Sequence, residues 1–252
     1  MNTVNDTDMG KQSTVWAYAE VAELLRESSA LFAVLDDATL DALLSLATPR
    51  QFKARQTVCH KGEQGDELFI LVHGKLKVCT SSDDGREAIL AILEDGDVSG
   101  EMSIVDGHPR SADVVAVQDS EILVIHRRQF LPFLEAHPKA AIALLTALIK
   151  RLRWTDALVE DMHFLDIRTR LAKTLVRLAQ DHGRTTAAGG VRIDLKLSQE
   201  DLGNLVGATR ESINKQMRAW VEEGILELSQ TNIVVRKSAE LQAYAKPRAP
   251  QA

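Results

Sequence analysis

The order of hydrophobic and polar residues divides the chain into segments with different periods. Between 31 and 47, apolar residues recur every three or four positions, as they do on one face of a helix. From 49 to 125 the pattern changes to short β-like runs, such as 67–72 and 75–79, which turns rich in Gly and Asp separate. Regularly spaced short strands with glycines at the corners are typical of a β-barrel or jelly roll.

A long helical pattern runs from Arg127 to Phe164, with Pro138 near a first turn, where a helix tolerates proline. A helix that joins two domains commonly buries its apolar stripe against a partner helix, which predicts dimerisation. The alternative is that the stripe packs only on its own barrel. The residues of this stripe are Leu144, Leu145, Leu148, Leu152, Ala157, Leu158 and Val159.

The last third of the chain mixes helical and strand-like patterns. The spacing predicts a helix over 166–180, a loop over 181–190 and a strand over 191–195. Two further helical patterns meet at Gly207, and a hairpin-like pair of short strands follows them. Three helices with a small β-wing form a winged helix-turn-helix.

The sequence therefore predicts an α+β fold made of five segments. Residues 1–15 are polar and are expected to be disordered, and helical spacing begins at Val15. The predicted segments are an N-terminal extension (1–30), a β-barrel or jelly roll (31–136), a long dimerisation helix (137–165), a winged helix-turn-helix (166–240) and a flexible tail (241–252).

The charge is distributed unevenly. The formal net charge of −6 by itself argues against a nucleic-acid partner. From Asp166 onward, however, 14 Lys and Arg stand against 10 Asp and Glu, a formal charge of +4, and the preceding residues carry −10. The basic part is the one that contains the predicted helix-turn-helix, as expected if only that part contacts phosphates.

The same composition argues against a membrane or secreted protein. No stretch approaches the roughly 20 apolar residues that cross a bilayer, and the polar start of the chain is unlike a secretory signal. We therefore expect a cytoplasmic protein with no membrane partner. Cys59 and Cys79 are too few for a disulfide framework or a zinc cluster. A haem or redox site near His60 or His73 is the alternative interpretation of these thiols.

Residues 197–218 carry the predicted DNA contacts. Ser198 and Asp201 form a candidate capping box at the first helix, Gly207 permits a tight turn, and Thr209 can cap the second helix. The N-terminal part of such a second helix enters the major groove, where arginine can bind guanine and glutamate can bind cytosine. The residues on its outer part are Arg210, Glu211, Asn214, Lys215 and Arg218.

Residues 96–114 carry the predicted ligand pocket. A glycine-rich turn, a carboxylate and an Arg-Ser pair suit a sugar phosphate. Arg110 supplies charge-assisted hydrogen bonds, Ser111 and the amide of Ala112 add neutral donors, and Glu101 can accept a hydrogen bond from a ribose hydroxyl. An internal ion pair between Glu101 and Arg110 is the alternative.

Three motifs in fixed order resemble the cyclic-AMP receptor protein/FNR family of bacterial transcription regulators, over residues from about 30 to 237. They are Gly100-Glu101 with 109–112, then 164–166, then 208–212 with Lys215. The resemblance implies that the barrel is a cyclic-nucleotide-binding domain. It also implies a hinge at Phe164 and Asp166.

The resemblance assigns roles residue by residue. It implies ligand binding by Gly100, Glu101, Met102, Arg110, Ser111, Ala112, Thr155 and Asp156. It implies DNA binding by Ser198, Thr209, Arg210, Glu211, Ser212, Asn214, Lys215 and Arg218. Asp156 and Lys215 depart from the serine and arginine of the receptor protein. A carboxylate at 156 accepts hydrogen bonds from adenine and also from guanine, so cyclic AMP is favoured and cyclic GMP is its rival.

The predicted function is a cyclic-nucleotide-responsive regulator, not an enzyme, with no cofactor and no bound metal. Its partners would be a second copy of the chain, a palindromic operator in double-stranded DNA and RNA polymerase, for which the loop 181–190 is a candidate contact. The alternative is a regulator of the same family that responds to haem, a gas or redox state, or that acts without a ligand. An enzyme acting on nucleotides is disfavoured because the pocket motif holds no evident catalytic nucleophile with a general base beside it.

Overall fold

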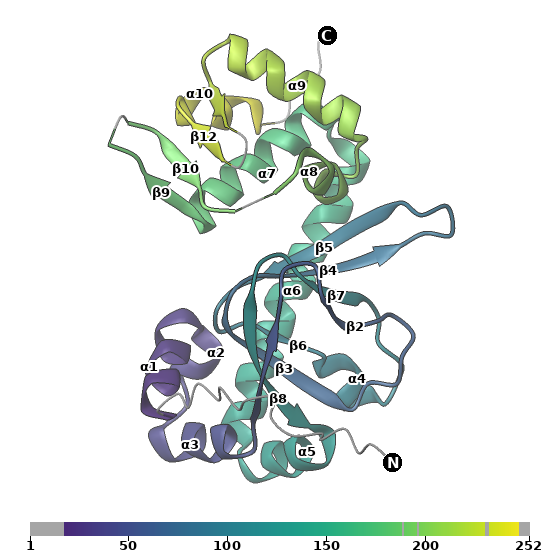
Figure 1. The fold of residues 1–252 in the computed structure, drawn as a ribbon, viewed down its shortest axis with the longest axis vertical. Helices are drawn as coiled ribbons and strands as arrows, with labels where there is room; N and C mark the ends of the chain where they lie inside the picture. The colour runs from purple at the N-terminus through teal and green to yellow at the C-terminus, as the bar shows by residue number, and fades with distance from the viewer. Residues whose placement is uncertain (1–17, 188, 196, 230–231, 247–252) are drawn as a thin grey trace, which may run out of the picture.

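The computed structural model describes residues 18–187, 189–195, 197–229 and 232–246. Its N-terminal half contains two four-stranded antiparallel sheets, ordered β1-β8-β3-β6 and β2-β7-β4-β5 (Figure 1). This arrangement confirms the predicted jelly roll. The strands are β1 (Thr48–Phe52), β2 (Thr57–Cys59), β3 (Glu67–His73), β4 (Leu76–Ser81), β5 (Glu87–Leu93), β6 (Val98–Ser99), β7 (Asp113–Ala116) and β8 (Ser120–His126).

Five of the described helices pack on the jelly roll. They are α1 (Tyr18–Ser28), α2 (Ala30–Ala33), α3 (Asp37–Ser45), α4 (Glu101–Asp106) and α5 (Arg127–Ala136). Leu25 of α1 is fully buried and belongs to the same hydrophobic cluster as Leu40 of α3 and Ile70 of β3. The described part of the predicted N-terminal extension is therefore part of the barrel's core. The disorder predicted for 1–15 lies outside the described residues.

Helix α6 (Pro138–Phe164) follows α5 after a break at His137. The sequence pattern ran through this point, but the residue before a proline is disfavoured in the helical conformation, and the backbone of His137 leaves the helix. Pro138 begins α6 as predicted.

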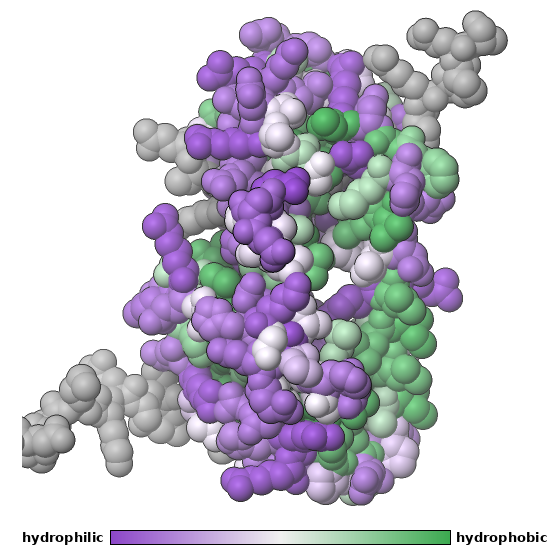
Figure 2. Space-filling view, turned by 90° about the vertical axis from the view of Figure 1, so that its right-hand side faces the viewer, coloured by the Kyte–Doolittle hydropathy of each residue, from purple (hydrophilic) through white to green (hydrophobic). Residues whose placement is uncertain are grey.

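Two faces of α6 are apolar, where the sequence predicted a single stripe. Leu144 and Leu148 pack against the barrel, whereas Leu145 and Leu152 are exposed, at 55% and 61%. Figure 2 shows a hydrophobic strip along one edge of the molecule. The large exposed apolar residues of α6 are Ile142, Leu145, Ile149, Leu152, Val159, Met162 and Phe164.

The C-terminal domain contains helices α7 (Ile167–Asp181), α8 (Gln199–Val206), α9 (Arg210–Glu222) and α10 (Ser238–Tyr244). Its sheet has the order β11-β12-β10-β9, with β9 (Gly183–Thr185), β10 (Val191–Ile193), β11 (Leu226–Leu228) and β12 (Ile233–Val235). This is the predicted winged helix-turn-helix. The loop predicted over 181–190 is wrong at 183–185, because these residues pair with β10.

The predicted flexible tail is also wrong at its start. Leu241 of α10 is fully buried, and the ring of Tyr244 lies 5.8 Å from the ring of Trp220. The guanidinium of Arg168 stacks 3.9 Å from the Tyr244 ring centre. A helix of seven residues is too short to be stable alone, so its existence depends on these contacts with α7 and α9.

Replacing Leu241 with alanine is expected to lower the free energy of unfolding of the C-terminal domain by about 2–5 kcal/mol, since a fully buried leucine is truncated. Urea unfolding followed by tryptophan fluorescence measures this change. Gln242→Ala, on the exposed side of the same helix, is the control and should leave the midpoint unchanged. Equal midpoints for the two variants would show that α10 does not support the domain.

The two domains contact each other through the hairpin of β4 and β5. Cys79 and Ile89 of this hairpin are buried in one cluster with Leu202 and Leu205 of α8. Polar contacts border the cluster: the Asn204 side chain donates to Glu87 at 3.2 Å. None of the described helices is long and apolar enough to cross a membrane.

Candidate functional site

A buried arginine forms the centre of the predicted ligand pocket. Arg110 follows α4 and is only 6% exposed. Its guanidinium donates to the carbonyl oxygens of Gly100 at 3.1 Å and Glu67 at 2.7 Å, and it stacks 4.9 Å from the Phe69 ring centre. Within the described residues no carboxylate lies within ion-pair distance of it. The pocket therefore holds a positive charge that is fixed in position but not neutralised.

Two glycines make room for this arginine. A Cβ atom on Gly100, whose φ is +86°, would lie 2.5 Å from the guanidinium of Arg110. A Cβ atom on Gly65 would lie 2.8 Å from Arg110 Nε and 2.5 Å from Ser103 Cβ. Gly65 lies in one of the glycine-rich turns between strands, and its closeness to Arg110 could not be predicted from the sequence because it depends on the fold.

Glu101 begins α4 and is only 2% exposed. Its Oε1 atom accepts a hydrogen bond from Arg151 at 2.7 Å, and its Oε2 atom is buried without a partner among the described residues. The alternative ion pair between Glu101 and Arg110 is therefore wrong. A buried carboxylate oxygen without a donor is costly, which favours a ligand that donates a hydrogen bond there.

Arg151 is the residue that sequence reasoning missed. It reaches from α6 to Glu101 and also donates to the carbonyl oxygen of Val98 at 2.8 Å. The signal was present, since Arg151 lies seven positions after Leu144 and so shares the barrel-facing side of the helix. The contact ties the long helix directly to the pocket.

The other predicted ligand residues lie farther out. Ala112 is buried, whereas Ser111 is exposed and its hydroxyl lies 3.8 Å from the sulfur of Met102. Thr155 and Asp156 are exposed on α6, and the Thr155 hydroxyl donates to the Arg151 carbonyl oxygen at 3.0 Å. Among the described residues of the single chain, neither Thr155 nor Asp156 is hydrogen-bonded to Glu101 or Arg110.

The two cysteines are buried thiols of low reactivity. Cys59 and Cys79 are both free and buried. Burial raises the pKa of Cys59, and burial beside Glu87 raises the pKa of Cys79 to about 12, so both thiols are protonated at neutral pH. In the part of the chain that the structure describes, no group of three His, Cys, Asp or Glu residues could hold a metal ion.

The turn between α8 and α9 has the caps that the sequence predicted. Ser198 and Asp201 form a capping box, Gly207 adopts a φ of +68°, and the Thr209 hydroxyl accepts from the amide of Ser212 at 3.2 Å. Arg170 of α7, which the sequence did not indicate, donates to the Val206 carbonyl oxygen at 3.0 Å. This hydrogen bond fixes the C-terminal end of α8 to α7.

Helix α9 presents a charged outer face at the end of the molecule far from the barrel (Figure 1). Ile213, Met217 and Trp220 are buried beneath it. The exposed residues are Arg210, Glu211, Lys215 and Arg218, with Ser212 and Asn214 half-buried beside them. Among the described residues none of the four exposed side chains has an ion-pair partner, so all four can contact another molecule.

The predicted hinge coincides with the break between α6 and α7. Phe164 is the last residue of α6 and is 79% exposed. The Asp166 carboxylate accepts from the amide of Thr169 at 2.7 Å and so caps α7. The cap fixes where α7 begins, and Leu165 in extended conformation separates the two helices.

Comparison with known proteins matches both halves of this description. The family model "Cyclic nucleotide-binding domain" matches residues 49–137, and "Crp-like helix-turn-helix domain" matches residues 169–244. The "CRP-like cAMP-activated global transcriptional regulator" of Mycobacterium tuberculosis is 32% identical over 216 residues, which cover 86% of this chain and 96% of the relative. The "Cyclic AMP receptor protein" of Thermus thermophilus is 30% identical over 219 residues, covering 87% and 98%.

Solved structures share the fold. The regulator CLP of Xanthomonas campestris, described as c-di-GMP responsive, has a TM-score of 0.73 and 22% identity, with 80% of this chain and 100% of that chain covered. A CooA mutant of Carboxydothermus hydrogenoformans has a TM-score of 0.69 and 23% identity, covering 81% and 90%. At these identities the likeness concerns the arrangement of the elements.

Proposed function

Because this chain belongs to the Crp–Fnr family of transcription regulators, with a cyclic-nucleotide-binding domain and a Crp-like helix-turn-helix, we propose that a cyclic nucleotide controls its binding to DNA. The active species in this proposal is a homodimer on a palindromic operator. The ligand is cyclic AMP, with cyclic GMP as the rival.

Two buried side chains that do not pair with each other, Glu101 and Arg110, carry the proposal. A cyclic phosphate would neutralise the Arg110 guanidinium, with Ser111 and the amide of Ala112 as further donors. The ribose 2′-hydroxyl would donate to Glu101 Oε2, the buried oxygen that has no partner. One ligand thus satisfies an uncompensated positive charge and an orphaned acceptor together. Gly100 and Met102 would line the pocket beside them.

The nucleobase would lie against α6. Thr155 and Asp156 are exposed there, and in the proposed dimer they can approach a ligand held by either subunit. The threonine hydroxyl can donate or accept, and the carboxylate accepts from adenine N6 as well as from guanine N1 and N2. The printed names of both curated relatives support cyclic AMP as the favoured ligand.

Dimerisation is inferred from the exposed side of α6. Ile142, Leu145, Ile149 and Leu152 follow one another at alternating spacings of three and four, which is the repeat that pairs helices in a coiled coil. Monomeric proteins rarely expose a long apolar strip of this kind. A second α6 laid against it would bury these side chains and bring two recognition helices onto one duplex.

Arg151 suggests how ligand binding would reach the DNA-binding domain. It joins Glu101 to α6, and α6 leads through Phe164 to the capped start of α7 at Asp166. A ligand shifts this equilibrium only if it binds the DNA-competent arrangement more tightly than the alternatives. In that arrangement the two α9 helices would enter major grooves one turn apart, about 34 Å. RNA polymerase would contact the segment 181–190.

Two measurements test the proposal together. Calorimetric titration of the purified dimer with cyclic AMP and, separately, cyclic GMP should show one site per chain for at least one of them. Fluorescence anisotropy of a labelled palindromic duplex should then show tighter DNA binding when that nucleotide is present. No heat from either nucleotide, or equal DNA affinity with and without it, would contradict the proposal.

Replacing Arg210 with alanine is expected to cost about 1–3 kcal/mol of discrimination between operator and mismatched duplex, because a base contact in the major groove is lost. Competition anisotropy with the two duplexes measures the ratio, and calorimetry should show ligand affinity unchanged. Arg86→Ala removes an exposed charge from the β4–β5 hairpin and should leave the ratio unchanged. An unaltered ratio for Arg210→Ala would remove this residue from base recognition.

A further inference from the structure

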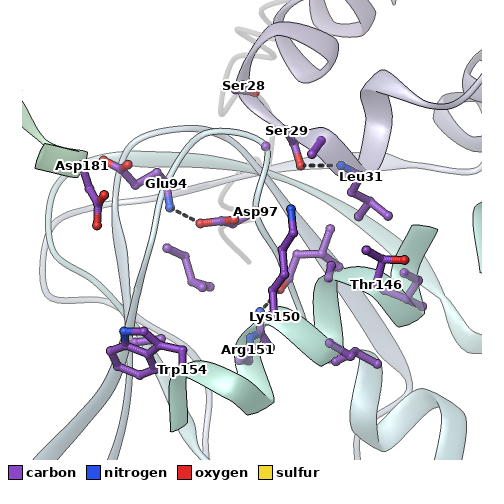
Figure 3. Close-up of a pocket in the computed structure, with 18 of the residues that line it drawn as sticks. Ser28, Ser29, Leu31, Glu94, Asp97, Thr146, Lys150, Arg151, Trp154 and Asp181 are labelled. Carbon is purple, nitrogen blue, oxygen red and sulfur yellow. Dashed lines mark hydrogen bonds between the residues drawn. The ribbon is translucent and has the colours of Figure 1, made fainter. Parts of the chain in front are cut away.

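A cavity of about 730 Å³ lies between the two domains, along α6 (Figure 3). Its walls come from α6, from the α1–α2 junction, from the turn between β5 and β6, and from α7. Glu101, Arg110 and Ser111 are not among its lining residues, whereas Arg151, the hydrogen-bond partner of Glu101, is, so the cavity adjoins the proposed cyclic-nucleotide pocket without containing its ligand-binding groups. The volume lies within the range of small-molecule sites, about 300–1,000 Å³.

Arg177 of α7 is an undercompensated cation in the wall of this cavity. Its side chain is half-buried, and its guanidinium stacks 4.7 Å from the ring centre of Trp154. Within the described residues it forms no hydrogen bond or ion pair with a carboxylate, and Asp161 and Asp181 act on it only at longer range. Burial lowers the pKa of Arg177. A cation withdrawn from water without a close partner attracts an anion.

The other charged side chains of the cavity also favour binding of an anion. Lys150 extends from α6 into the open space in Figure 3 and has no partner among the described residues. Glu94 is already engaged, because it binds Lys75 and lies 2.6 Å from Nδ1 of His182. Asp97 accepts a hydrogen bond from the Glu94 amide at 2.9 Å. Asp181 also lines the cavity, but among the described residues it forms no ion pair with Arg177 or Lys150 and acts on Arg177 only at longer range, so this one carboxylate faces two cations.

We propose that this cavity binds a small organic anion with an aromatic body. Arg177 and Lys150 would neutralise its acidic group, and Trp154 with the aliphatic lining would enclose its body. The aliphatic side chains that line the cavity include Leu31, Val34 and Leu148, and Ile142 at its rim is shared with the proposed dimer contact. Because both domains contribute walls, an occupant stabilises their present arrangement, and it affects nucleotide affinity only as far as the nucleotide changes that arrangement.

The probe for this site is 8-anilinonaphthalene-1-sulfonate, an aromatic anion whose fluorescence rises in apolar surroundings. Titration of the full-length protein, without and with saturating cyclic AMP, should give one bound probe per chain in both conditions. This design separates the site from the proposed nucleotide pocket, since a failure of cyclic AMP to bind leaves the probe titration intact. Displacement of the probe by cyclic AMP at one equivalent would place it in the other pocket and overturn the proposal.

Three variants locate the probe. Arg177→Gln and Lys150→Gln each remove one charge, and Ala147→Phe adds a ring to the cavity wall. Each should weaken probe binding by about tenfold or more. Arg153→Gln, an exposed residue of α6 outside the lining, is the matched control and should bind as the parent does. Circular dichroism checks that each variant is folded. Unchanged binding in folded Lys150→Gln and Ala147→Phe, or no probe binding by the parent, overturns the proposal.

Discussion

Replacing Arg110 with alanine is expected to abolish the response to cyclic nucleotides. The guanidinium is the one uncompensated positive charge at the centre of the described pocket, and the phosphate has no other cation among the residues that we assign to it. Removing one partner of a buried charge pair costs about 2–5 kcal/mol, which corresponds to a loss of affinity of about 30- to several thousand-fold. Calorimetric titration of the variant with the nucleotide that the parent binds measures this loss.

The same substitution leaves the carbonyl oxygens of Glu67 and Gly100 without their donor. We therefore expect a lower melting temperature as well, and circular dichroism at the titration temperature must show that the variant is folded. Ser111→Ala is the graded control, since one neutral hydrogen bond is worth about 0.5–1.5 kcal/mol and its loss should weaken binding only modestly. Unchanged nucleotide affinity in folded Arg110→Ala would show that the pocket lies elsewhere.

Replacing Leu152 with glutamate is expected to break the dimer. Leu152 is 61% exposed in the middle of the apolar side of α6, so its substitution does not disturb the barrel. In a symmetric dimer the change places two carboxylates against each other at an apolar contact, which removes burial and adds repulsion. Analytical ultracentrifugation should show a monomer at concentrations at which the parent is a dimer.

Loss of the dimer should also lower the affinity for the operator. Two linked half-site contacts gain about 10²- to 10⁴-fold in overall affinity over one, and a monomer forfeits that gain. Val105→Glu is the matched control, because Val105 is exposed at 56%, lies on α4 and is not part of the cavity wall. That control should remain dimeric. A dimeric Leu152→Glu variant with full operator affinity would mean that the chains associate through another surface.

Local chemistry determined most of what the sequence could predict. Short β-like runs between turns rich in Gly and Asp predicted the jelly roll, because both signals lie within a few consecutive residues. The caps at Ser198, Asp201 and Thr209 are equally local, since each side chain bonds an amide within three residues. The outer residues of α9 followed from helical spacing once Ile213 and Met217 were assigned to the core.

Contacts between distant parts of the chain were decided only by the tertiary structure. Arg151 meets Glu101 across 50 residues, and no local period relates the two positions. The same holds for α10, whose buried Leu241 belongs to one hydrophobic cluster with residues of α7 and α9. It holds also for the two apolar faces of α6, which share one helical pattern but face different surroundings. Periodicity shows which side of a helix or strand is apolar. How the elements pack decides which partner covers that side, which ion pairs form and where a cavity remains.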